Sequence, residues 1–196
     1  MEFLAALTYR HFEEMARLEQ QFYGDEHIAP PEQAYSWYQK YSYTCVAASE
    51  KGRIAGFVNL FPIRPEILLQ LRKGSFNDRD LTSDCIVDIH ASETEPLFMF
   101  LSCIVVDRTY HGKGLARRLL QKAVESYAEV SHRCSCIVTD NVTKEGIRFS
   151  ARYGFRPLGE TEHASLLQEQ DYQSFCRRLE DGASAKDLQE QNPMFL

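Results

Sequence analysis

The chain has 196 residues, of which 44% are hydrophobic and 26% are charged, and its formal net charge is −6. These values are ordinary for a soluble globular protein, and the length favours one domain with a sizeable core. The acidic balance argues against nucleic-acid binding, because phosphate contacts need a basic surface. No apolar run approaches the length of a membrane-spanning helix, so we expect no membrane partner.

Residues 1–17 mix charged with apolar side chains and lack the apolar core of a secretory signal. We therefore expect a cytoplasmic protein. The six cysteines show no paired CxxC spacing of the kind that binds zinc. We interpret them as buried, reduced thiols and expect no metal site.

Helical and strand-like patterns of apolar residues follow one another along the chain. The predicted elements are helix 9–23, helix 32–41, strand 44–49, strand 53–61, strand 97–107, helix 115–130, strand 134–139, helix 143–153, a strand from 155 and a strand within 166–175. This order predicts an α+β fold around a mixed sheet, in which strands 97–107 and 134–139 are parallel. We assign residues 1–178 to one domain and residues 179–196 to a polar C-terminal tail.

A basic, glycine-bearing segment, residues 107–116, follows a buried strand and opens a helix. The first amides of a helix have no intrahelical acceptor and carry partial positive charge. Because Gly112 and Gly114 let the backbone approach a bulky anion, a diphosphate is the expected occupant. Leu115-Ala116 after Gly114 rule out a P-loop, and the third glycine of a dinucleotide fingerprint is missing. The alternative is an ordinary strand-to-helix turn with incidental glycines.

The run His111-Gly112-Lys113-Gly114-Leu115-Ala116 resembles the acetyl-CoA motif [QR]-x-x-G-x-[GA] of the GCN5-related N-acetyltransferases (GNAT). His111 departs from the usual Gln or Arg. Downstream, Tyr153-Gly154-Phe155 resembles the end of the family's Asn-x-x-Ala helix, with Thr143 at the Asn position and Gly146 at the Ala position. The hairpin strand from Arg53 also resembles the family, and the likeness spans roughly residues 5–176.

The resemblance implies a GNAT-like fold with acetyl-CoA as co-substrate and no metal. It implies that the pantetheine arm pairs with the backbone of Ile104 and Val106, in a gap between two parallel strands. The pyrophosphate would take the amides of residues 111–116, with Lys113 and Arg117 either adding charge or remaining solvated. The implied cofactor-binding residues are Ile104, Val105, Val106, His111, Gly112, Lys113, Gly114, Leu115, Ala116, Arg117 and Thr143.

Acetyl transfer needs an oxyanion donor and a base, and an acid can assist it. By analogy with the family, the amide of Ile104 is the candidate oxyanion donor. Ser150 stands where many relatives have a Tyr, so Tyr153 is the candidate acid, with packing beneath the helix as the alternative. Glu95 is the candidate base, with a solvated loop position as the alternative. The same two interpretations, a base or a solvated loop residue, apply to three further groups just before the central strand: Asp88, His90 and Glu93.

We therefore interpret the chain as an N-acetyltransferase that moves an acetyl group to a primary amine of a small molecule or a protein. The aromatic segment 23–43 and the connection 62–96 would form the acceptor site. The alternative is a non-catalytic protein of the same fold that binds or senses acyl-CoA. The sequence is also compatible with a homodimer.

Overall fold

The computed structural model describes residues 1–182. Its centre is a seven-stranded sheet in the order β1-β2-β3-β4-β5-β7-β6. The strands are β1 (Glu2–Phe3), β2 (Cys45–Glu50), β3 (Arg53–Ile63), β4 (Leu97–Val106), β5 (Cys134–Asn141), β6 (Arg156–Glu160) and β7 (Leu166–Asp171). Only the β4–β5 pair is parallel among these neighbours, which confirms the predicted mixed sheet and its parallel central pair.

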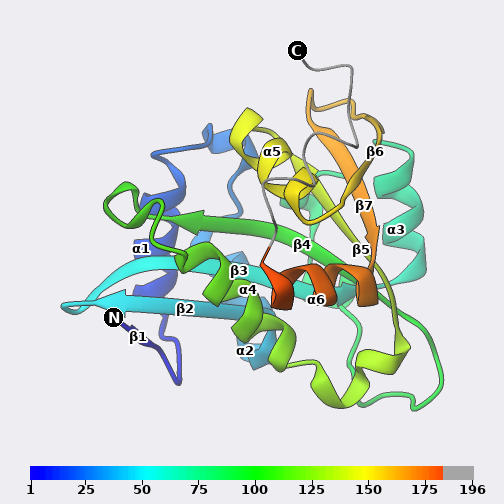
Figure 1. The fold of residues 1–196 in the computed structure, drawn as a ribbon, viewed down its shortest axis with the longest axis horizontal. Coiled ribbons are helices and arrows are strands. Elements are labelled where there is room, and N and C mark those ends of the chain that lie inside the picture. The colour runs from blue at the N-terminus through cyan, green and yellow to red at the C-terminus, as the bar shows by residue number, and fades with distance from the viewer. Residues whose placement is uncertain (183–196) are drawn as a thin grey trace.

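Six α-helices of the described chain pack on the two faces of this sheet. They are α1 (Tyr9–Glu19), α2 (Pro31–Lys40), α3 (Pro65–Arg72), α4 (Leu115–Glu125), α5 (Lys144–Arg152) and α6 (Tyr172–Asp181). Figure 1 shows α4 and α6 across the near face of the sheet and α1 and α2 behind it. Each helix is amphipathic; α1, for example, buries Phe12, Met15 and Leu18 on one stripe.

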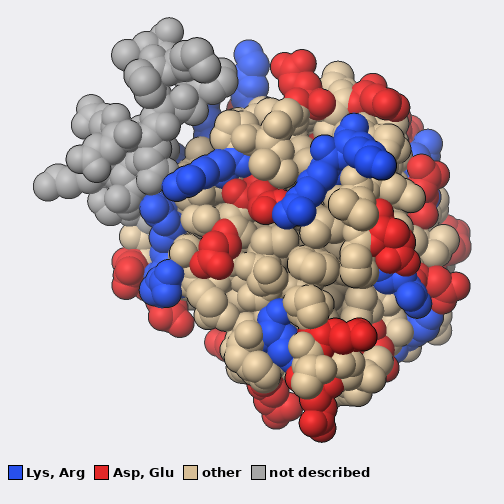
Figure 2. Space-filling model, turned by 90° about the vertical axis from the view of Figure 1, so that its right-hand side faces the viewer, with Lys and Arg blue, Asp and Glu red and all other residues tan. Residues whose placement is uncertain are grey.

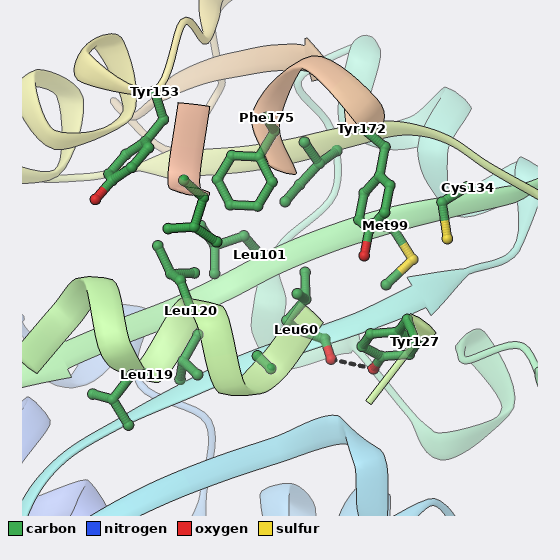
Figure 3. Packing of buried hydrophobic residues seen from close by; sticks show 14 of the residues in the cluster. Leu60, Met99, Leu101, Leu119, Leu120, Tyr127, Cys134, Tyr153, Tyr172 and Phe175 are labelled. Atoms are coloured by element: carbon green, nitrogen blue, oxygen red, sulfur yellow. Dashed lines mark hydrogen bonds between the residues drawn. The ribbon is translucent and has the colours of Figure 1, made fainter. Parts of the chain in front are cut away.

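The core is divided by the sheet. On the face of α4 and α6, Leu119, Leu120 and Phe175 pack against Leu60 and other strand residues (Figure 3). On the opposite face, the side chains of α1, α2 and α3 pack in two adjoining clusters. Because successive side chains of a strand alternate between faces, each residue of β4 and β5 can be assigned to one helix layer.

The parallel strands β4 and β5 separate before they end. Their register stops at Phe100 and Val138, although β4 continues to Val106 and β5 to Asn141. On its other side β4 stays paired with β3, with an irregularity that leaves Ser102 without an opposite residue. Such a bulge bends its strand and is common beside active sites. The separation therefore opens a gap at the carboxyl end of the central pair.

The strand predicted within 166–175 is present as β7, and it is followed by a helix, α6, that we did not predict. The strand expected within 166–175 ends at Asp171, and α6 begins at Tyr172 because the Asp171 side chain accepts a hydrogen bond from the amide of Ser174 at 2.8 Å. Leu179 is buried in the core, so α6 crosses the boundary that we placed after residue 178. The rest of the predicted tail, residues 183–196, lies outside the described residues.

The surface carries both signs of charge. Figure 2 shows Lys and Arg interspersed with Asp and Glu over the face that it presents, which lies on the side of α3 and β7. Across that side Arg72 forms a bidentate ion pair with Glu169, with nitrogen–oxygen distances of 2.7–3.0 Å. None of the helices within residues 1–182 is both long and apolar enough to cross a membrane.

Candidate active site

A cavity of about 900 Å³ lies where β4 and β5 separate. Its walls are formed by α1, the short 3-10 helix Asp25–His27, the start of α2, the second half of β4, the end of β5, the turn before α4 and part of α5. This volume is typical of a pocket for a small molecule or cofactor. The sequence analysis predicted a cofactor at this end of the central strand. Most of the predicted cofactor-binding residues line this cavity.

The glycine turn forms one end of the cavity. Gly112 and Gly114 have φ of 72° and 74°, a left-handed conformation in which other residues are strained. A Cβ atom at either position would meet nothing within 4 Å, so the backbone angle and not crowding requires glycine. Gly114 is the N-cap of α4, and the turn before it is fixed by Asp107, which accepts from the Thr109 amide at 2.8 Å. Hydrogen bonds from Thr109 lower the pKa of Asp107, so this brace is anionic at neutral pH.

Residues 111–117 border the cavity, except Lys113. Two amides of the turn are already engaged: that of His111 donates to the carbonyl of Arg108 at 3.2 Å, and that of Lys113 to the carbonyl of Tyr110 at 3.3 Å. The Lys113 ammonium instead lies 5.5 Å from the centre of the Tyr110 ring. Arg117 borders the cavity, but its Nε donates to the carbonyl of Leu179 at 2.9 Å and its Nη2 to that of Glu180 at 2.5 Å. The guanidinium therefore binds the last turn of α6, and the charge expected near the diphosphate is already engaged.

Ile104, Val105 and Val106, the strand residues that we expected beside a cofactor arm, line the cavity. The carbonyl of Val106 is not open, however. The Nε2 atom of His111 lies 2.8 Å from it, and the imidazole stacks on Phe22 with ring centres 5.9 Å apart. The expected pairing at Val106 thus requires the His111 ring to rotate.

Thr143 and Ser150 have structural partners. The Thr143 side chain accepts a hydrogen bond from the amide of Gly146 at 3.0 Å and so caps α5. Thr143 also lines the cavity. Ser150 is buried, and its Oγ accepts from Asn141 Nδ2 at 3.0 Å. Ser150 therefore joins α5 to the end of β5, which leaves proton donation in this region to another side chain.

Tyr153 is buried and borders the cavity. Its ring packs on Phe149 and Phe175, with centre-to-centre distances of 5.0 and 5.9 Å. Figure 3 shows its hydroxyl pointing away from Phe175. Burial raises the pKa of Tyr153, while two nearby arginines oppose the shift. The phenol therefore stays protonated at neutral pH, as a proton donor must.

Glu95 lies outside the cavity. It is exposed and precedes β4, and its carbonyl accepts from Arg133 Nε at 2.9 Å. At about 3.3 Å per residue, the strand carries the chain roughly 23 Å from Glu95 to the bulge at Ser102. The structure thus does not bring this predicted base to the gap, nor does it bring Asp88, His90 or Glu93.

Two carboxylates that the sequence analysis did not select do line the cavity on the side of α1 and α2. The first is Glu19, whose Oε1 accepts from the Cys103 thiol at 3.0 Å. Burial, with Cys103 and Glu19 nearby, raises the pKa of Tyr23 above its usual range. A signal was present in the sequence: Glu19 follows Phe12 and Met15 at helical spacing, and a carboxylate on an apolar stripe is out of pattern.

The second is Asp140, near the end of β5. Burial raises the pKa of its carboxyl, while Ser165, His163 and His27 oppose the shift. All four residues line the cavity. His163 and Ser165 belong to the turn between β6 and β7, and His27 ends the 3-10 helix before α2. No local sequence pattern connects these segments, because the tertiary structure alone brings them together.

The comparisons with known proteins agree with this geometry. The model of the acetyltransferase (GNAT) family matches residues 12–155. Among solved structures, the chain is similar to a GphF GNAT-like decarboxylase in complex with isobutyryl-CoA (TM-score 0.62, 11% identity, 88% of this chain and 100% of that chain). It is similar to the loading GNATL domain of CurA from Lyngbya majuscula (TM-score 0.61, 12% identity, 88% and 99%). It is also similar to an N-acetyltransferase from Staphylococcus aureus Mu50 (TM-score 0.54, 15% identity, 88% and 99%).

A comparison with curated proteins gives no match. The solved structures share so little sequence with this chain that they show the common fold alone. The family model covers well over half of the chain, and its range contains the glycine turn, the separating strands and the helix that ends at Tyr153. The chain therefore belongs to the acetyltransferase (GNAT) family.

Proposed function

We propose that this protein transfers an acetyl group from acetyl-CoA directly to a primary amine. The observation that carries the proposal is the separation of β4 from β5 directly beside a helix N-terminus built on two left-handed glycines. The amides before α4 suit the diphosphate of a CoA thioester, and the gap suits its arm. That one similar fold was solved with isobutyryl-CoA supports an acyl-CoA in this cavity.

The charges along the cavity support an amine acceptor. Around the glycine turn and α5, where an anionic cofactor would lie, the lining residues include Arg108 and Arg152 together with one carboxylate, Glu145, which leaves an excess of positive charge. Glu19 and Asp140 line the side of α1 and α2. An anionic co-substrate and a cationic acceptor would therefore each meet the opposite sign of charge.

The reaction is an addition followed by an elimination. The neutral amine attacks the thioester carbonyl carbon, a C–N bond forms, and the C–S bond then breaks. The nitrogen loses one proton as the amide forms, and the CoA sulfur gains one. In this proposal the Ile104 amide stabilises the oxyanion, and the Tyr153 hydroxyl protonates the leaving thiolate. The proton that the nitrogen loses passes through solvent and restores the Tyr153 hydroxyl. An acceptor that arrives as an ammonium loses one further proton to a base before attack.

The test is calorimetric titration with acetyl-CoA of the wild type, Gly114→Glu and Gly52→Glu. Both glycines have positive φ, at 74° and 73°, and open space around the Cβ position, so the two variants share their strain and their added charge. Gly52 lies in the hairpin between β2 and β3, away from the cavity. We expect binding to persist in Gly52→Glu and to vanish in Gly114→Glu, because only the latter places a carboxylate in the diphosphate site.

Turnover is then followed as thiol release with a panel of primary amines. Absence of acetyl-CoA binding to the wild type would refute the proposed function. Tight binding with no turnover on any amine would favour the non-catalytic alternative, a protein that binds or senses acyl-CoA.

A further inference from the structure

The inner wall of the cavity holds a polar group assembled from separate parts of the chain. Asp140 comes from β5, and His163 and Ser165 come from the turn between β6 and β7. His27 faces the same carboxylate from the 3-10 helix Asp25–His27. This group and the glycine turn come from different segments of the cavity lining.

Asp140 stands where the two central strands part. The last paired residues are Phe100 and Val138, and continuing that register by two residues would set Asp140 against Ser102, at the bulge of β4. Val138 packs in the cluster that contains Trp37 of α2. Because side chains alternate, Asp140 shares this face with Val138, on the side of α1 and α2. Its carboxyl therefore projects toward the acceptor side of the gap.

Two atoms of this group have unused hydrogen-bonding capacity. The Ser165 side chain hydrogen-bonds to the Asp140 carboxyl and lowers its pKa. Asp140 Oδ1 and His163 Nε2 are nevertheless buried atoms with no hydrogen-bond partner within the described part of the chain. Buried polar atoms are nearly always paired, so two such atoms lining one cavity point to a ligand that pairs them.

The turn that supplies His163 and Ser165 is held in a strained shape. Ala164, between them, has φ of 58°, which is rare for a residue with a Cβ atom. The shape is braced by a hydrogen bond between the Thr161 and Ser165 hydroxyls and by the Thr161 amide, which donates to the Ser165 carbonyl at 2.9 Å. Backbone strain of this kind persists where surrounding contacts enforce it, often at functional sites.

We propose that Asp140, His163 and Ser165 form the subsite for the acceptor amine. Asp140 binds the acceptor as a primary ammonium, and Nε2 of a neutral His163 then takes one proton from it, leaving the amine ready to attack the thioester. The proton later passes from His163 to solvent. This assignment rests on the proposed function, and it replaces Glu95 as the base.

The energetics fit a ligand better than a purely structural role. Burial makes the charged form of Asp140 costly, and no lysine or arginine is among the groups that shift its pKa. An ammonium beside it would offset that cost. A metal ion is a poorer fit, since the described residues hold no group of three His, Cys, Asp or Glu placed to ligate one.

The test compares Asp140→Asn and His163→Gln with Glu162→Gln. Glu162 is exposed in the same turn and does not line the cavity, so its variant removes one charge without touching the subsite. Each protein is titrated with acetyl-CoA and assayed for acetylation of n-butylamine, benzylamine and 1,4-diaminobutane. We expect acetyl-CoA affinity to stay within about threefold in all of them. For the best amine, we expect His163→Gln to lower kcat/KM by about 10²-fold or more and Asp140→Asn to raise KM at least about tenfold.

The split between kcat and KM adds a readout that a structural role would not change. His163→Gln should lower kcat with little change in the KM for the amine, whereas Asp140→Asn should mainly raise that KM. Unchanged amine kinetics in both variants, or no use of any of the three amines by a wild type that binds acetyl-CoA, would overturn the subsite. Failure of the wild type to bind acetyl-CoA would instead refute the proposed function itself.

Discussion

The imidazole of His111 covers the carbonyl of Val106, with 2.8 Å between Nε2 and the oxygen. The acetyl-CoA motif of the family usually has Gln or Arg at this position, and here the side chain turns back onto the end of β4. His111 borders the cavity, but its backbone amide donates to the carbonyl of Arg108 at 3.2 Å. A cofactor arm that pairs with Val106 would therefore have to displace the His111 ring.

We predict that His111→Ala strengthens acetyl-CoA binding by about 2- to 10-fold, because one hydrogen bond of about 0.5–1.5 kcal/mol no longer has to be broken. Titration calorimetry measures the change, and Phe22→Leu, which removes only the stacked ring, should act in the same direction. Weaker binding in His111→Ala would show that the ring itself contacts the cofactor.

A second prediction concerns Asp140 and the stability of the protein. Burial raises the pKa of its carboxyl in the folded state, so the native protein holds this proton more tightly than the unfolded chain. The protonated Asp140 carboxyl therefore contributes to the free energy of unfolding. This contribution is full below the pKa that Asp140 has in the unfolded chain, and it is lost as the pH rises through its pKa in the folded protein. Asp140→Asn should therefore be at least as stable as the wild type at pH 7 and gain nothing near pH 4.

Urea unfolding at the two pH values measures this difference, with Glu162→Gln as the control that should show no such trend. A loss of stability at pH 7 in Asp140→Asn would mean that the carboxylate serves the fold. The combination of retained stability and lost amine acetylation is what the acceptor subsite requires.

Arg117 gives a third prediction, because its guanidinium binds two carbonyls at the end of α6. Arg117→Ala should lower the free energy of unfolding by about 1.5–3 kcal/mol, since hydrogen bonds to a charged group are lost. Acetyl-CoA affinity should change by less than about threefold. Lys122→Ala removes a charge from the exposed side of α4 and should affect neither quantity. A large loss of affinity with stability retained would place Arg117 on the diphosphate.

Tyr153 gives a fourth prediction, on the chemical step. Tyr153→Phe keeps the ring that packs on Phe149 and Phe175 but removes the hydroxyl. We expect kcat to fall about 10²-fold, while acetyl-CoA affinity and stability change little. Because its pKa is raised above 10.0, the hydroxyl stays protonated, and kcat of the wild type should not decline between about pH 7 and 9. Unchanged kcat in the variant would mean that the thiolate leaves without an acid.

Local patterns in the sequence determined much of the fold and the cofactor half of the cavity. The glycines of residues 112–114 encode a left-handed turn by themselves, and the apolar run of β4 encodes a buried central strand. These features depend on neighbours in the chain or on backbone angles, which a sequence shows directly.

Only the tertiary structure decided the side of the cavity that we propose for the acceptor. Glu95 is close to β4 in sequence but lies at the wrong end of a ten-residue strand. Asp140 and His163 are separated in the chain by α5 and β6, and they share a cavity because β5 pairs with β7, which pairs with β6. The same folding engages Arg117 with α6 and turns Ser150 toward Asn141. Residue type fixes what a group can do, whereas strand pairing and burial fix which groups share a cavity.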